Sequence, residues 1–171
     1  MVTLVAGILD IASAIGFTVM AGNSPMRMLA AIATGPLGDD VRERAWAPAA
    51  GLAVHFAIMA AMVCAYALAA ARQPQLLSRL GPIAAGIGYG LLLYLVMYWL
   101  VLPLRWPTLH PQTEFVAVAK ALFAHTICVG LPIAFLLSPR VAVPAAKGAC
   151  LVSGAFELES GPGSARSTRG K

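Results

Sequence analysis

The sequence predicts an all-α integral membrane protein. We expect a four-helix transmembrane bundle with a short interfacial helix between spans 1 and 2, and a disordered C-terminal tail. Four long apolar stretches occupy residues 2–22, 49–71, 82–104 and 115–137, and about 20 residues at 1.5 Å each cross a hydrocarbon core of roughly 30 Å. Hydrophobic residues make up 60% of the chain and charged residues only 11%, whereas about a quarter of a soluble domain is charged. Residues 1–140 are therefore assigned to the transmembrane domain and residues 141–171 to a flexible tail.

The charged residues lie where a membrane requires them. Among 12 Lys and Arg and seven Asp and Glu, only Asp10 and Lys120 fall inside the four stretches. The basic residues that give the chain its net charge of +5 are therefore interpreted as determinants of membrane topology and as contacts to lipid headgroups. No nucleic-acid partner is expected. Basic residues are slightly more frequent on the side that holds both termini, so both termini are predicted to be cytoplasmic. The first stretch lacks a basic leading region, so it is interpreted as a retained helix and not as a signal peptide.

The connections between spans differ in character. Ser24 and Pro25 form an N-cap followed by proline at the first helical position. Apolar residues continue from there to residues 34–36, which predicts a short helix at the membrane interface. Residues 39–44 are expected to form a charged turn, and residues 72–81 a short polar turn between antiparallel spans 2 and 3.

Asp10 is the residue least suited to lipid. A carboxylate near the bilayer centre costs about 2.5–3.5 kcal/mol, so it is expected to face the bundle and to have a partner. Helical spacing places small and polar residues on its face, with large aliphatic residues opposite. This face comprises Thr3, Ala6, Gly7, Asp10, Ser13, Ala14 and Phe17. Asp10 could relay a proton or bind an ion, or it could fix helix packing as a hydrogen-bonded acid.

His55 and His125 lie in the first halves of spans 2 and 4, in a layer that Asp10 approaches from the other side. Two histidines from separate helices could bind haem or a metal, and an Asp–His pair could pass protons. The favoured interpretation is hydrogen bonding between helices, with no cofactor and no metal. Met59 and Met62 follow His55 on one face and are interpreted as packing residues, not as copper ligands.

Glycines predict close helix packing in spans 1 and 3. Gly86 and Gly90 form a small-xxx-small motif, and Gly7 lies on the face of Asp10. The segment of residues 130–132, Gly-Leu-Pro, predicts a kink in span 4. An aromatic belt is expected at the end of span 3, formed by Tyr98, Trp99 and Trp106.

The chain contains no Walker loop, nucleophile elbow, HExxH motif or Rossmann glycine signature. Cys64, Cys128 and Cys150 have neither the spacing of a disulfide framework nor that of a zinc site. The protein is therefore expected not to be an enzyme.

Four ordered pieces carry a resemblance to a known group of proteins. These pieces are AGILDIASAIGF, GLAVHFAIMAAMVCAYALA, GYGLLLYLVMYWLVLPL and LFAHTICVGLPIAFLL. Together they resemble an uncharacterised family of small four-helix bacterial inner-membrane proteins, which has no assigned activity. The resemblance covers about residues 1–140 and implies a bacterial inner-membrane location. Asp10, His55 and His125 match positions in the family's motifs.

Three functions follow from these observations. The first is a non-enzymatic accessory or scaffold subunit that acts through helix packing, as a homo-oligomer or with a partner membrane protein in the lipid bilayer. The second is a small proton- or ion-handling transporter or channel component that uses Asp10 with His55 and His125. A haem-binding redox subunit is the third and least favoured.

Overall fold

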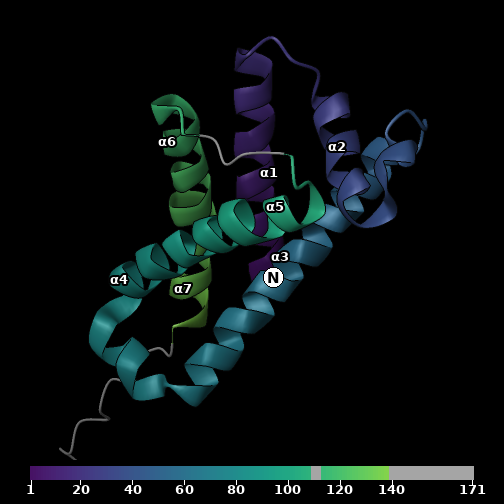
Figure 1. Ribbon diagram of the computed structural model, residues 1–171. Coiled ribbons are helices and arrows are strands. Elements are labelled where there is room, and N and C mark those ends of the chain that lie inside the picture. The colour runs from purple at the N-terminus through teal and green to yellow at the C-terminus, as the bar shows by residue number, and fades with distance from the viewer. Residues whose placement is uncertain (109–112, 139–171) are drawn as a thin grey trace, which may run out of the picture. The chain divides into compact units, whose positions relative to one another are not determined.

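The computed structural model describes residues 1–108 and 113–138. Within these residues every regular element is a helix, which confirms the all-α prediction (Figure 1). The predicted flexible tail of residues 141–171, which contains Cys150, lies outside the described residues.

In the part of the chain that the structure describes, four helical segments are long and apolar enough to cross a membrane. Their bounds agree with the four predicted stretches except at the start of the third. The first two spans are single helices, α1 (Val2–Met20) and α3 (Ala47–Arg72). The third consists of α4 (Pro74–Leu95), the π-helical stretch η2 (Val96–Val101) and α5 (Leu102–Arg105). The fourth consists of α6 (Phe115–Phe123), the π-helical stretch η3 (Ala124–Gly130) and α7 (Leu131–Leu137).

A short helix does lie between the first two spans. Helix α2 covers Pro25–Leu37, with Ser24 at its N-cap and proline at its first position, as the sequence predicted. It ends at Gly38, whose φ of 96° is a conformation that residues with a Cβ rarely adopt. The predicted charged turn contains a single 3₁₀ turn, η1 (Asp39–Val41).

The predicted polar turn over residues 72–81 is wrong in its extent. Only Gln73 leaves the helical conformation before α4 begins at Pro74, because proline is tolerated in the first turn of a helix. Leu77 then packs against the core cluster of the bundle. The backbone changes direction at Gly81, where φ is 71°, and the predicted start of span 3 at residue 82 corresponds to the helical segment after this bend.

Each π-helical stretch is followed closely by a proline. Pro103 follows η2 and Pro132 follows η3. A proline ring inside a helix clashes with the carbonyl group four residues earlier and removes one backbone donor, and a widened turn relieves this conflict. The sequence predicted a kink at residues 130–132, and the structure contains a π-helical stretch immediately before that point.

The core joins all four spans. Its buried residues are Ala6, Met59, Tyr66, Leu93, Val129, Ile133 and Ala134. Close approach depends on glycine at several crossings. A Cβ at Gly51 would collide with the backbone of Leu29 in α2, and a Cβ at Gly7 would lie 2.6 Å from the ring of Phe56. A Cβ at Gly86 would lie 2.9 Å from the Cα of Leu131, so α4 packs against the fourth span of the same chain.

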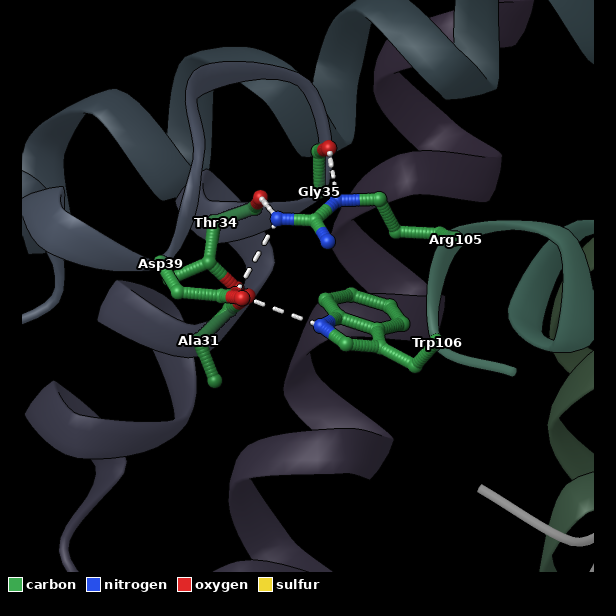
Figure 2. A network of polar contacts seen from close by, with 6 residues as sticks. All are labelled: Ala31, Thr34, Gly35, Asp39, Arg105 and Trp106. Carbon is green, nitrogen blue, oxygen red and sulfur yellow. Dashed lines mark hydrogen bonds and ion pairs between the residues drawn. The ribbon is translucent and has the colours of Figure 1, made fainter. Parts of the chain in front are cut away.

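A polar network fixes the end of the third span to the connection after α2 (Figure 2). Arg105 donates from Nε to the carbonyl of Gly35 at 2.9 Å, and from Nη2 to the carbonyl of Thr34 at 2.9 Å. The same Nη2 lies 3.0 Å from Oδ1 of Asp39, which also accepts from the indole of Trp106 at 3.2 Å. The guanidinium therefore binds two backbone carbonyls in the last turn of α2 while it pairs with an acid.

Candidate functional site

Asp10 lies at the middle of α1 and faces the interior of the bundle. Ala6 and Gly7 on its face are buried, while Val5 and Ile8 are exposed. This burial pattern confirms the predicted inward face of the first helix. The carboxylate side chain retains 21% of its exposed area, so it is largely enclosed without being sealed.

His55 of α3 is the direct partner of Asp10. Its Nδ1 atom lies 3.9 Å from Oδ2 of the carboxylate, and its side chain is only 9% exposed. The other ring nitrogen, Nε2, lies 3.0 Å from the carbonyl oxygen of Gly7 in α1. Because a carbonyl oxygen can only accept, Nε2 carries a proton and donates it. The predicted hydrogen bond between helices is therefore present at His55.

This arrangement assigns the tautomer of His55. With Nε2 protonated, the neutral imidazole of His55 has an unprotonated Nδ1 facing Asp10. One proton can then reside on the carboxyl group or on Nδ1, and the pair is electrically neutral in both cases. The separation of 3.9 Å exceeds hydrogen-bond length, so transfer needs a bridging water or a small side-chain rotation. The geometry can thus hold one exchangeable proton without burying a net charge.

His125 lies in the π-helical stretch η3 of the fourth span. This stretch packs against α1, the helix that carries Asp10. The Nδ1 atom lies 2.9 Å from the carbonyl oxygen of Ala121 in the same helical segment, so the predicted bond to a neighbouring helix is wrong for this residue. Because Nδ1 donates to that carbonyl, Nε2 is the nitrogen left to accept or release a proton.

Two tyrosines of the third span enclose His125. Tyr98 lies 5.9 Å from the imidazole and Tyr94 lies 6.3 Å from it, both edge to face between ring centroids. The two tyrosine rings stack at 5.0 Å. We call Asp10, His55, Tyr98 and His125 the Asp10 cluster.

Tyr98, which was predicted to belong to an interfacial aromatic belt, also packs against residues of the bundle. Its exposure is intermediate and its ring stacks on Tyr94 and lies against His125, whereas Trp99 is 60% exposed. A signal for its position was present in the sequence. Gly86, Gly90, Tyr94 and Tyr98 follow one another at intervals of four, which places them on one helical face.

The histidine contacts bear on haem and metal binding. Nε2 of His55 donates to the carbonyl of Gly7, so it is not a ligand, whereas Nδ1 lies 3.9 Å from the Asp10 carboxylate, beyond hydrogen-bond length. Across residues 1–108 and 113–138, no group of three or more His, Cys, Asp or Glu could hold a metal ion. Met59 is only 2% exposed within the core cluster, which supports its interpretation as a packing residue.

Comparison with known proteins adds no assignment. No family model, no curated protein and no solved structure matches this chain.

Proposed function

We propose that this chain is a small multi-pass membrane protein that carries protons through the Asp10 cluster. One observation supports this more than any other. The Asp10 carboxylate faces an imidazole nitrogen of His55 at 3.9 Å, and the second nitrogen of that ring is held by a backbone carbonyl. A pair of this kind stores a proton in two neutral forms, which is what a relay inside an apolar bundle requires.

The composition of the cluster favours protons over metal cations. A Ca²⁺ or Mg²⁺ site needs several oxygen ligands around one point, whereas the cluster combines one carboxylate with two imidazoles and a phenol. All four groups exchange protons, and His125 has one ring nitrogen that is not bonded to its own helix. The transported species that we propose is therefore a proton and not a coordinated metal ion.

The location follows from the same proposal. The four apolar helices are consistent with a multi-pass membrane protein, and the sequence resemblance favours the bacterial inner membrane. The distribution of basic residues favours cytoplasmic termini. Helix α2 is half-buried against α3 and carries the exposed Arg27 at its start, which suits a helix at the membrane interface.

Proton flux into sealed proteoliposomes tests the proposal. The purified full-length chain is reconstituted with a pH-sensitive dye inside, and a potassium diffusion potential supplies the driving force. We expect flux above that of empty liposomes, and we expect Asp10→Asn to reduce it by about 100-fold or to background, since a lost proton-transfer group typically costs 10²–10⁴. Asp40→Asn makes the same chemical change at an exposed acid in the η1 turn and should leave the flux unchanged.

The double variant His55→Ala His125→Ala provides the second arm. Its flux should also fall to background, because Asp10 then has no imidazole to exchange with. If the wild-type chain conducts no protons, or if the Asp10 and double histidine variants both retain full flux while remaining folded, the proposal is wrong.

A second candidate function, an accessory or scaffold subunit, is favoured by a different observation. In the first three spans only 17% of the most apolar 18-residue window is buried within the chain, and in the fourth 33%. Much of each helix is thus available to lipid, to another copy or to a partner membrane protein. Counting subunits in lipid bilayers by single-molecule photobleaching distinguishes these cases, because a monomer without partners argues against a scaffold.

A further inference from the structure

A cleft enters the bundle between α1 and α6. It has a volume of about 460 Å³ and is lined by residues of α1, of the segment after it, of η2 and of α6. Its outer end lies where α1 finishes and α6 begins, at Asn23 and Glu114, which are both exposed. These two chain segments lie on the same side of the bundle (Figure 1).

The lining is unusually polar for the interior of apolar spans. Thr18, Lys120 and Tyr98 contribute to its walls, together with the two residues at the outer end. The ammonium of Lys120 lies 5.5 Å from the ring centroid of Phe17, on the opposite wall. A lysine charge within a span costs about 2.5–3.5 kcal/mol in hydrocarbon, and this cost falls if the cleft contains water. The volume accommodates on the order of ten water molecules, with polar partners to bind them.

The inner end of the cleft reaches the Asp10 cluster. Tyr98 lines the cleft, and the same ring packs edge to face against His125. Ala121, whose carbonyl accepts from His125, also lines the cleft. The lining of the cleft therefore includes one member of the Asp10 cluster, Tyr98, and the residue whose carbonyl is bonded to His125.

We propose that the cleft between α1 and α6 is a water-filled entrance that connects one membrane surface to the Asp10 cluster, with Tyr98 at its inner end. That protons pass through this entrance rests on the proposed function. The hydration of the cleft and its opening to one side do not depend on it. With both termini cytoplasmic, this entrance opens on the opposite, outer side of the membrane.

Cysteine accessibility tests the entrance directly. In a full-length chain from which the three native cysteines have been removed, single cysteines replace Ala14 and Ala117, which line the cleft. Ala12→Cys and Ala119→Cys are the matched controls. Each begins from alanine and lies two residues from its counterpart, on an exposed face that does not line the cleft. A membrane-impermeant, cationic thiosulfonate is applied to sealed vesicles from each side in turn.

We expect the two cleft cysteines to react about tenfold faster than their controls, and from one side only, because reaction requires a hydrated thiolate. Low and equal rates at all four positions would mean that lipid or side chains fill the cleft. High and equal rates would mean that these helix faces do not lie in a bilayer. Either result overturns the inference.

Proton flux separates this inference from the proposed function. Modification of Ala14→Cys should block flux if the cleft is the entrance, and modification of Ala12→Cys should not. Fast labelling that leaves flux unchanged overturns the link to the cluster, although the cleft is then hydrated. Full flux in both the Asp10→Asn variant and the double histidine variant overturns the proposed function and leaves the labelling result unaffected.

Discussion

The contact between α4 and η3 makes Gly90→Ala the most informative single change in the bundle. A Cβ at Gly90 would lie 2.5 Å from the Cα of Thr126 and would also collide with the carbonyl oxygen of His125. Both neighbours are backbone atoms, so no flexible side chain can move aside. Gly88 lies two residues away in the same helix, where a Cβ would meet nothing within 4 Å. Gly88→Ala is therefore a matched control.

The expected magnitude comes from the difference between the two variants. Overpacking a tight contact costs about 1–3 kcal/mol. Replacing a helical glycine by alanine contributes up to about 1 kcal/mol in favour of the helix, but this gain is common to both positions and cancels in the comparison. We therefore expect Gly90→Ala to be about 1–3 kcal/mol less stable than Gly88→Ala.

Thermal unfolding in mild detergent measures this difference through a reporter already present in η3. Cys128 is buried and Cys64 is exposed, so in a background with Cys64→Ser and Cys150→Ser a thiol-reactive dye detects separation of the packed helices at Cys128. Steric trapping in lipid bicelles then measures the free energy of unfolding of each variant. Equal stability of the two variants would refute the close contact between α4 and η3.

Two further predictions concern hydrogen bonds outside the cluster. Arg105→Ala should lower the free energy of unfolding by about 1–3 kcal/mol, because two backbone carbonyls lose a charge-assisted donor. Asp39→Ala should lower it by only about 0.2–1 kcal/mol, since that side chain is 67% exposed. A larger loss for the aspartate variant in the same unfolding assay would contradict this order. Tyr89→Phe should cost about 1 kcal/mol, because its hydroxyl donates to the carbonyl of Met62 at 2.6 Å, and an unchanged midpoint would show that this bond contributes nothing.

The four spans could be predicted from the sequence because their only requirement is length and apolarity. The inward face of Asp10 was also predictable, since a buried acid requires a partner and small residues surround it at helical spacing. The segment around Pro74 was not predicted correctly. Proline at a first helical turn and proline in a polar turn have similar sequence signatures, and the packing of Leu77 on the core decides between them.

The missed parts of the site depend on features that regular periodicity does not describe. The π-helical stretches themselves were not predicted, because a widened turn changes the angle between successive side chains and leaves no regular spacing in the sequence. The partner of His125 was missed for a related reason. Its ring bonds to Ala121 four residues earlier, whereas the prediction considered only partners on other helices.

The packing motif and the polar cluster form one structural unit, and this connects the two candidate functions. Gly90 lets α4 approach the backbone of His125 and Thr126 directly. That approach brings Tyr94 and Tyr98, on the same face of the third span, against the imidazole. A side chain at Gly90 would therefore move the tyrosines away from His125 while it weakened the bundle. A scaffold needs this contact only for stability, whereas a proton relay also needs it for geometry. Proton flux that falls in Gly90→Ala at a temperature where the variant remains folded would accordingly favour the relay over the scaffold.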